Sequence, residues 1–449
     1  MTQKTLDHKD TAQLPNFIEL ADISKSQTYQ NALYIEDPQT LDAYCSALQE
    51  NNEWIAIDTE FVRVDTYYPE LSLVQIADSN LNLAIIDPLA IKQDVLQKKQ
   101  LPSFSEKNFD LEQNKNHHGL NPLLEILVNP TICKVFHSAR QDLEVLYLIA
   151  GILPQNIFDT QLAAIFFGQG DLVGFARVIQ SELGLTLPKS QTRTNWHTRP
   201  LTENQISYAL DDVYYLAQLF KSYQTKLSSQ QKQAINEDCE LLLDSKLYQT
   251  KPNEAWLKIK GGKNLKPKQL AIVRTLAEWR EHFAIEHNQP KKWTISDEVI
   301  LHIAKRPPKT AQALYKVPNI KASSVKEFGE KWVSLIDEVF TASPENYPNP
   351  TPKDKSPTAQ EEILLQVLLA MAQQISIDAN ITPTNLVQKT HLLSFIREKS
   401  PALTEQKDSK LALINRGWRK YLFFDLAEQF LNNEISLSCD KHSLKLTRI

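Results

Sequence analysis

The sequence predicts an α/β domain built on a mixed β-sheet, followed by two small all-helical domains. Three observations predict this fold class. Closely spaced strand-like segments occupy residues 54–87, strands alternate with helices between residues 121 and 223, and strand signals vanish after about residue 238. With 449 residues, the chain is long enough for roughly three domains of ordinary size.

The first domain is expected to begin after a loose, polar arm at residues 1–30. A short strand at residues 32–35 leads to Asp37 and Pro38, which suit the N-cap and first turn of a helix that runs to about residue 50. Strands at 54–61, 71–77 and 83–87 follow closely enough to pair as a meander. Residues 97–118 are polar and aperiodic, which predicts a surface insertion.

Strands and helices alternate in the rest of this domain. A helix is expected at 121–128, a strand at 132–137, a helix from Ser138 that stops at Gly151, and a strand at 157–159 before a further helix. The segment 202–223 predicts a long helix, because Thr202 and Gln205 form a capping-box pattern ahead of an apolar stripe. The α/β domain is therefore expected to span residues 31–240.

Two helical units follow. Residues 241–342 have apolar positions at helical spacing, most clearly at 266–287. Residues 343–357 are rich in proline and predict a linker. The second helical unit is expected at 358–440, before a short polar tail.

Charge is unevenly spread along the chain. Residues 251–340 carry 17 Lys and Arg against 10 Asp and Glu, a net charge of +7. Because the whole chain has a net charge of −5, the other residues together carry −12. An acidic part joined to a basic part suits a metal-dependent catalytic domain with a polyanion-binding module, although basic helical faces are often only solvated.

Other classes of protein are disfavoured by simple features. No apolar run of about 18 residues is present and the N-terminus is too polar for a signal peptide, so we expect a cytoplasmic protein without a membrane segment. The four cysteines are far apart and lack metal-ligand spacing, which argues against a zinc site or a disulfide framework.

Asp58 and Glu60 are the most informative pair of residues. They lie two apart in an otherwise apolar strand, so their carboxylates project from the same face and need a positive partner, usually a divalent metal ion. Alone, such a pair more often marks a strand that ends early in a solvated acidic loop.

Three further positions carry candidate chemistry. Asp142 lies one turn into a helix, where an acid could also be a surface residue that complements the helix dipole. Tyr208 and Asp212 lie four apart and share a helix face. Asp211 competes with Asp212, and spacing barely separates the two.

Four ordered motifs together resemble the DEDD family of 3′-5′ exonucleases. They read DTEFVR at 58–63, HSARQDLEVL at 137–146, DTQ at 159–161 and YALDDVYYL at 208–216. The Tyr-x-x-x-Asp spacing resembles the tyrosine subgroup, and within it the ribonuclease D family. This resemblance implies a ribonuclease H-like exonuclease domain, and both helical units resemble HRDC domains.

The resemblance also implies a site with two divalent ions, Mg²⁺ or Mn²⁺. Asp58 would be shared by both ions, Glu60 and Asp212 would complete one site, and Asp142 would belong to the other. Tyr208 would orient the attacking water. The same resemblance selects Asp212 over Asp211.

RNA contacts are expected from a basic loop and one aromatic residue near the motifs. The loop offers Lys189, Arg193 and Arg199 beside Trp196, a combination that suits single-stranded nucleic acid, while Trp196 could instead anchor the loop to the core. Phe61 is expected either to wedge against the terminal base or to lie in the core.

Three further polar residues lie near the motifs: His137, Gln75 and Asn195. His137 and Gln75 are expected to support the sheet through hydrogen bonds. Asn195 occupies a position where many relatives have an aspartate, so no acidic role is expected there.

The expected activity is metal-dependent 3′→5′ exoribonuclease activity that trims the 3′ ends of transfer RNA precursors and other small RNAs, in a monomer. The nearest alternative is a proofreading or repair exonuclease that acts on DNA. A non-catalytic RNA-binding scaffold is the alternative from another class, and the intact set of five candidate residues speaks against it.

Overall fold

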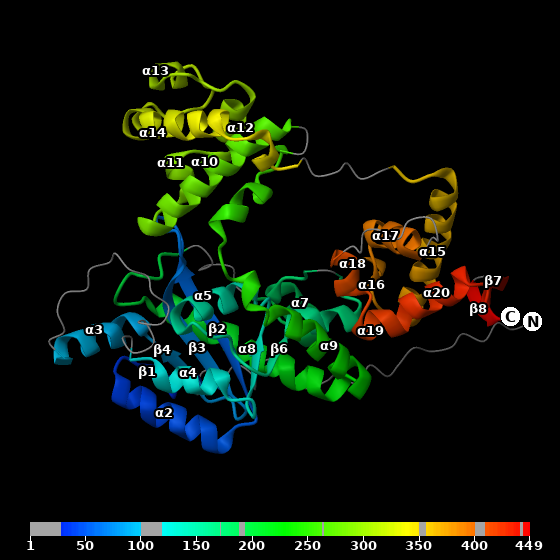
Figure 1. Cartoon of the computed structure of the whole chain (residues 1–449). Helices are drawn as coiled ribbons and strands as arrows, with labels where there is room; N and C mark the ends of the chain where they lie inside the picture. The colour runs from blue at the N-terminus through cyan, green and yellow to red at the C-terminus, as the bar shows by residue number, and fades with distance from the viewer. Residues whose placement is uncertain are drawn as a thin grey trace, which may run out of the picture.

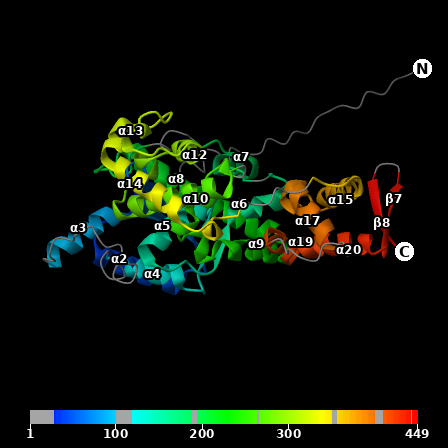
Figure 2. The same ribbon diagram turned by 45° about the horizontal axis from the view of Figure 1, so that its top comes forward.

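The computed structural model describes residues 28–99, 119–170, 172–187, 194–262, 265–349, 356–399, 409–440 and 443–449. Figures 1 and 2 show a sheet domain with two helical units attached to it. The parts of the predicted N-terminal arm and insertion that cover residues 1–27 and 100–118 lie outside the described residues.

A six-stranded mixed sheet forms the first domain, as predicted. The strands run in the order β1-β4-β3-β2-β5-β6; β3 is antiparallel to β2 and β4, and the other neighbours are parallel. The strands are β1 (Leu33–Ile35), β2 (Trp54–Val62), β3 (Glu70–Asp78), β4 (Leu83–Ile86), β5 (Cys133–Phe136) and β6 (Ile157–Asp159). The consecutive pairing of β2, β3 and β4 confirms the predicted meander.

Local sequence signals explain where the predicted helices begin and end. Helix α2 (Pro38–Asn51) is capped by Asp37, whose carboxylate accepts the backbone N–H groups of Gln39 and Thr40 at 3.0 Å. Helix α5 (Arg140–Ala150) ends at Gly151 with φ 68°, a conformation that glycine adopts without a steric penalty. Helix α4 (Asn121–Val128) matches its expected range.

Helix α8 (Glu203–Lys226) covers the sheet and places part of the site. It begins at the predicted capping box, with Thr202 and Gln205 bonded reciprocally. Its buried stripe packs against β2, β3, β4 and β5. The remaining helices of this domain are the short α6 (Thr160–Ala163) with the 3-10 turn η2 (Ala164–Phe167), and α9 (Ser229–Leu242).

Two helices of this domain, besides α9, were not predicted from the sequence. Helix α3 (Pro88–Lys99) was not predicted, and its last three residues belong to the segment expected to be an aperiodic insertion. Helix α7 (Phe175–Leu183), capped at Gly174 and Gly184, is the second and carries residues of the site described below. Both are short segments in which propensity competes with tertiary context.

The first helical unit packs around the fully buried Trp332. It contains η4 (Pro252–Lys258), α10 (Pro267–Glu286), α11 (Lys291–Thr294), α12 (Asp297–Lys305), α13 (Ala311–Leu314), α14 (Ala322–Thr341) and η6 (Pro344–Asn346). The turn η6 lies in the segment expected to be a linker, and residues 350–355 of that linker are outside the described ranges.

The first helical unit contacts the segment that follows β2. Tyr67 donates its hydroxyl hydrogen bond to Glu281 Oε1 at 2.5 Å, and Asn288 Oδ1 accepts the backbone N–H groups of Tyr67 and Tyr68 at 3.1 and 3.3 Å. Lys291 lies 3.4 Å from Glu281. These contacts fix the unit at the end of the strand that carries Asp58 and Glu60.

The second helical unit has a third apolar core and ends in a hairpin. Its elements are α15 (Ala359–Asp378), α16 (Pro383–Leu386), α17 (Lys389–Lys399), α18 (Ser409–Ile414), α19 (Gly417–Arg419), η7 (Lys420–Phe424), α20 (Asp425–Leu431), β7 (Ile435–Asp440) and β8 (Ser443–Arg448). The chain therefore ends in a β-hairpin, and the prediction of a short polar tail is wrong. Leu437 and Leu446 are paired across the hairpin and pack on the core, which the alternation of apolar and polar residues could have indicated.

The second helical unit docks on α9, and Figures 1 and 2 both show α19 beside that helix. Glu237 accepts the backbone N–H of Trp418 at 2.8 Å. Asp238 accepts the indole N–H of Trp418 at 3.1 Å and the Arg419 guanidinium at 2.6 Å. The ring of Phe166 packs on Trp418 with centroids 5.3 Å apart.

Membrane insertion finds no support in the helices. Within the described ranges, none combines the length and apolar character that crossing a bilayer requires.

Gly417→Ala should weaken the docked arrangement more than a matched glycine substitution. Gly417 has φ 53°, and a β-carbon there would lie 2.3 Å from Glu237 Oε2, the atom that accepts from Trp418. The left-handed backbone should cost about 1–2 kcal/mol, and disturbing the Glu237 bond about 1 kcal/mol more. Thermal unfolding and limited proteolysis of residues 409–449 measure the loss.

Gly170→Ala is the control for backbone strain alone. Gly170 has φ 82° and no atom within 4 Å of its would-be β-carbon. Equal destabilisation by the two substitutions would contradict a role of Gly417 in docking.

Candidate active site

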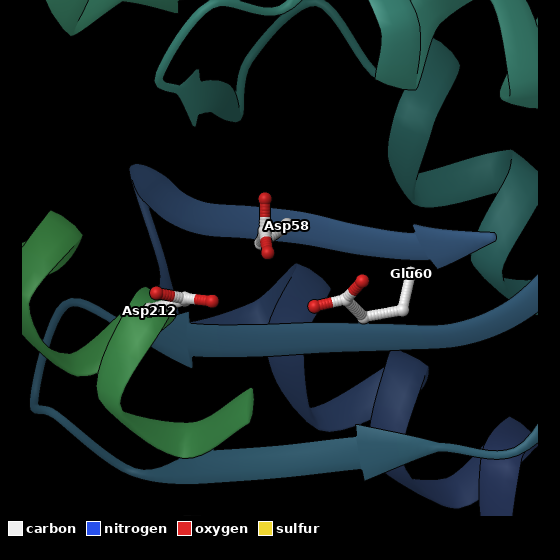
Figure 3. A group of neighbouring side chains, drawn as sticks. All are labelled: Asp58, Glu60 and Asp212. Atoms are coloured by element: carbon white, nitrogen blue, oxygen red, sulfur yellow. The ribbon is translucent and has the colours of Figure 1, made fainter. Parts of the chain in front are cut away.

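Three carboxylates converge at the interface between β2 and α8. One oxygen each from Asp58, Glu60 and Asp212 lie within 4.8 Å of one another. Figure 3 shows the first two on the strand and the third on the helix that packs across it. The predicted same-face arrangement of the strand pair thus holds, and the solvated-loop alternative does not, because β2 continues to Val62.

Asp142 joins the same pocket from α5. It is 7% exposed, and its carboxylate accepts the Thr59 hydroxyl at 2.5 Å. The pocket has a volume of about 600 Å³ and is lined by Asp58, Glu60, Asp142 and Asp212. The alternative of a surface residue is therefore wrong, although Asp142 is not part of the group of three convergent oxygens.

Tyr208 contributes a phenol to the pocket wall. It lies one helical turn before Asp212, and the two side chains interact. Burial raises the pKa of the Tyr208 phenol, and the charges of Asp212, Glu60 and Asp58 raise it further. The phenol is therefore protonated at neutral pH.

Burial and mutual repulsion disfavour the charged forms of the carboxylates. The pKa of Glu60 rises to about 10 through burial and then through Asp58, Asp212 and Asp142. The pKa of Asp212 rises to about 7 through burial and Asp211, although its interaction with Tyr208 lowers it. Burial, followed by Asp212, raises the pKa of Asp58, and burial, followed by Asp58, raises that of Asp142.

Asp211 points away from this group. It is 6% exposed and accepts a hydrogen bond from the Tyr29 hydroxyl. Asp211 is therefore buried, and the choice of Asp212 as the residue that meets Asp58 and Glu60 agrees with the geometry.

The two supporting polar residues behave differently. His137 lies on the pocket wall, where its ring nitrogens pair with Thr160 Oγ1 at 2.9 Å and Val173 O at 3.0 Å, so its predicted supporting role is confirmed. Gln75 is fully buried in β3, yet its amide has no hydrogen-bond partner among the described residues. No direct hydrogen bond among the described residues supports the predicted role of Gln75, which stays a prediction.

The predicted RNA-binding loop is largely structural where it is described. Trp196 is 3% exposed and packs in the core near Tyr208, so it anchors the loop instead of offering a face to a base. Lys189 and Arg193 lie outside the described residues. Asn195 accepts the backbone N–H of His197 at 3.0 Å, a local turn contact.

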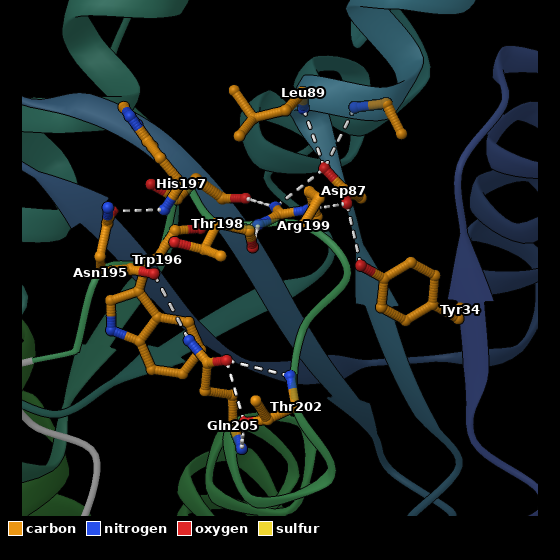
Figure 4. Close-up of polar contacts among 12 residues, drawn as sticks. Tyr34, Asp87, Leu89, Asn195, Trp196, His197, Thr198, Arg199, Thr202 and Gln205 are labelled. Carbon is orange, nitrogen blue, oxygen red and sulfur yellow. Dashed lines mark hydrogen bonds and ion pairs between the residues drawn. The ribbon is translucent and has the colours of Figure 1, made fainter.

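Arg199 cannot serve as the predicted RNA contact, because all five of its N–H donors are engaged. They pair with both Asp87 oxygens and with the carbonyls of Ser72, Trp196 and Thr198, at 2.5 to 3.0 Å (Figure 4). Asp87 is fully buried, and the guanidinium compensates its charge and lowers the pKa of that carboxyl.

Comparison with known proteins gives matches along most of the chain. A 3′-5′ exonuclease family model matches residues 33–228, and an HRDC domain model matches residues 269–336. Ribonuclease D of Pseudomonas paraeruginosa is 31% identical over 384 residues, which cover 84% of this chain and 92% of that protein. The chain belongs to the ribonuclease D family.

Further relatives agree with this assignment. Ribonuclease D of Bartonella henselae is 31% identical, with 87% of each chain covered. The crystal structure of Escherichia coli RNase D, described as an exoribonuclease involved in structured RNA processing, superposes with a TM-score of 0.72 at 28% identity and covers 90% of this chain and 99% of that one. The expected fold class is confirmed. The HRDC match lies within the first helical unit, so the HRDC nature of the second unit stays a prediction.

The donor set of this ribonuclease D family member fits divalent metal ions. Asp58, Glu60 and Asp212 supply only carboxylate oxygens, which Mg²⁺ and Mn²⁺ prefer. Burial and repulsion between carboxylates raise their pKa values, and no basic side chain of the described residues offsets either effect. A cation at the convergent oxygens would offset that repulsion.

Sequence reasoning missed the residues that α7 contributes to this ribonuclease D pocket. Gly174, Phe175 and Arg177 line its wall, together with Gln141 from α5. Arg177 is exposed and is the one arginine or lysine among the residues that line the pocket. The glycine at the N-cap was the available signal, but only the fold shows that this helix faces Asp58.

The metal-free protein should become less stable as pH rises. Protons bind Glu60 and Asp212 more tightly in the folded state than at their ordinary pKa values of 4.5 and 3.8. The resulting stabilisation is complete below about pH 4 and is lost as pH passes the folded pKa values near 7 and 10. Thermal unfolding in chelator at pH 5, 6.5 and 8 should show a falling Tm, and Mg²⁺ should raise Tm most at pH 8.

Glu60→Gln isolates this effect from other titrating groups. The neutral amide removes the repulsion, so its metal-free Tm should fall less with pH than that of the unsubstituted protein. A wild-type Tm that rises between pH 5 and 8, with no difference from Glu60→Gln, would contradict the assigned direction of the pKa shifts.

Asp212→Asn and Asp211→Asn separate the adjacent aspartates. Asp212→Asn removes one of the three convergent carboxylates and should lower kcat on the order of 100-fold or more. Asp211→Asn keeps an acceptor for Tyr29 and should change kcat by less than roughly tenfold. Single-turnover rates on a short RNA measure both, and the opposite ranking would show that Asp211 holds the catalytic role.

Proposed function

We propose that this chain is a two-metal 3′→5′ exoribonuclease that releases nucleoside 5′-monophosphates and trims the 3′ ends of transfer RNA precursors and other small structured RNAs. The observation that carries the proposal is the convergence of Asp58, Glu60 and Asp212 within 4.8 Å, with Asp142 in the same pocket. Membership of the ribonuclease D family supports RNA as the substrate and disfavours the DNA-directed alternative.

The four carboxylates divide into two ion-binding groups in this proposal. Asp58 is shared, Glu60 and Asp212 complete the first group, and Asp142 belongs to the second. The tight group of three oxygens supports the first assignment, and the separate position of Asp142 beside Thr59 supports the second. Bound divalent ions would activate the attacking water and stabilise the charge that develops on the leaving 3′-oxygen.

Tyr208 orients water and does not remove its proton. Its phenol is protonated at neutral pH, because burial and the carboxylates raise its pKa. A protonated phenol that interacts with Asp212 can accept one hydrogen bond from a water at the pocket and hold it in place.

Two other residues of the pocket wall are assigned to the RNA. Arg177, exposed at the pocket, is proposed to bind a backbone phosphate. Phe61 follows the β-bulge at Glu60 and lines the same pocket, which supports contact with the terminal base. Both would hold the 3′ end above the carboxylates.

The first helical unit is proposed to position structured RNA through Lys292 and Trp293. Trp293 is 48% exposed and Lys292 beside it is exposed, so a cation and an aromatic face are both available. Two other basic residues of this unit are not assigned to RNA, because each has a partner within the protein. Arg280 is buried and bonded to Ile295 O and Asp297, and Lys291 pairs with Glu281.

The second helical unit, residues 358–440, is proposed to be a second HRDC domain. Its support is a compact helical core, centred on Phe395 and Phe424, that is separate from the first unit's core. A monomer and a cytoplasmic location stay predictions.

The proposed activity is tested by a time course on 3′-extended transfer RNA beside single-stranded DNA of matched length. We expect nucleoside 5′-monophosphates from the RNA only in the presence of Mg²⁺ or Mn²⁺, and none in chelator. Asp58→Asn should lower the rate by on the order of 100-fold or more while the circular dichroism spectrum stays unchanged. Normal turnover by Asp58→Asn, or faster cleavage of DNA than of RNA, would refute the proposal.

Lys292→Glu combined with Trp293→Ala tests the role of the first helical unit. Loss of a charge contact and of stacking worth roughly 1–3 kcal/mol should raise KM about fivefold or more for structured RNA, and much less for a short oligonucleotide. Lys331→Glu makes the same charge change on α14, about two turns beyond Ser324, which contacts Trp293 O. An equal rise in KM for both substrates, or for the control, would argue against RNA positioning.

A further inference from the structure

Gln75 is a fully buried amide that lacks the partners such a group requires. Its Oε1 and Nε2 atoms have no hydrogen-bond partner among the described residues, and the side chain is 0% exposed. An unpaired buried amide costs about 1–3 kcal/mol. Buried polar groups of this kind are commonly satisfied by an enclosed water.

The strand register places Gln75 directly beside the shared carboxylate. In the antiparallel pairing of β2 with β3, Gln75 is opposite Asp58. Side chains of directly opposed residues project from the same face, with their β-carbons roughly 5 Å apart. The other cross-strand neighbour of Gln75 is Ile85 on β4, whose side chain is apolar. Of the two cross-strand neighbours, only Asp58 therefore has a side chain that can take part in hydrogen bonding with the amide.

Helix α8 closes this region from above. It packs on both β2 and β3 and brings Asp212 to Asp58. Gln75 is not among the residues that line the pocket, whereas Asp58 is. The amide is therefore buried on the sheet face that carries Asp58, but outside the pocket lining.

We propose that Gln75 is a positioning residue whose amide holds an enclosed water against the Asp58 carboxylate. The water accepts from the Gln75 amide or donates to its carbonyl, and donates its remaining hydrogen to Asp58. This inference rests on the proposed function, because it concerns how Asp58 is oriented to hold its ions.

The chemistry of glutamine suits this position. The backbone N–H of Thr59 also favours the charged form of the Asp58 carboxylate. A lysine or arginine at position 75 would neutralise the charge that a metal ion needs, and an apolar residue would leave the carboxylate free to rotate. A neutral amide fixes orientation without competing for charge, and partners of this kind commonly tune metal affinity by 10- to 100-fold.

The test uses the full chain with Gln75→Met, which keeps the length of the side chain but removes both amide atoms. Mn²⁺ binding is measured by calorimetry without RNA, and kcat and KM are measured on a short RNA. We expect Mn²⁺ to bind roughly 10- to 100-fold more weakly, with kcat lowered and KM for RNA nearly unchanged. Excess Mn²⁺ should restore part of kcat.

Tyr223→Phe is the matched control. The Tyr223 hydroxyl is likewise buried and unpartnered within the described part of the chain, but it does not line the pocket. Its removal should leave Mn²⁺ affinity unchanged. Gln75→Leu is made as a second apolar variant.

Each outcome decides a different question. Absence of Mn²⁺ binding by the unsubstituted chain would refute the proposed function itself. Binding by the unsubstituted chain that is equal in Gln75→Met would overturn only the inference about Gln75. Failure of both apolar variants to fold, while Tyr223→Phe folds, would also overturn it, because Gln75 would then be a purely structural residue.

Discussion

Repulsion among buried carboxylates is the constraint on which the rest of this structure depends. Burial raises the pKa values of Asp58, Glu60 and Asp212; the charge of Asp212 raises those of Asp58 and Glu60 further, and the charge of Asp58 also raises that of Glu60. Such a group would spread apart on a soft scaffold. Here the strand pair is fixed in the centre of the sheet, and Asp212 is fixed by a helix of 24 residues with a capped start and a long buried stripe. The stability of the core thus sustains an arrangement that is unfavourable by itself until a cation binds.

The need to pair buried charges also explains why two candidate residues, Arg199 and Asp211, are not available for chemistry. Arg199 is basic and close to the site, but the negative charge of the fully buried Asp87 needs a cationic partner. The five Arg199 donors bond to Asp87 and to neighbouring carbonyls. Asp211 is adjacent to Asp212, yet the helix turns about 100° per residue, so its carboxylate meets Tyr29 instead. In each case the partner of a buried charge determines whether it is available for chemistry.

What the sequence could predict follows the range of the interactions involved. The strand of Asp58 and Glu60, the Asp37 cap, the Thr202 box and the Gly151 stop depend on a few neighbouring residues, and these predictions agree with the structure. The burial of Trp196 and the exposed or buried state of Asp142 depend on contacts between distant segments. Spacing alone therefore left both open. Helix α7 was missed for two reasons: it is short, so its local signal is weak, and its role depends on a pocket formed with distant segments.

The attachment of the helical units links substrate placement to the catalytic strand. Trp418 and Arg419 hold the second unit on α9. This helix packs on β6, the edge strand of the sheet, so the second unit is attached away from β2. The first unit instead bonds to Tyr67, four residues after Arg63, and Arg63 itself donates to Tyr67 O at 3.2 Å. Because that segment continues directly from β2, the contacts of Tyr67 join the first unit to the strand end beside Glu60. RNA held by Lys292 and Trp293 would then be positioned in the same frame as the carboxylates that act on its 3′ end.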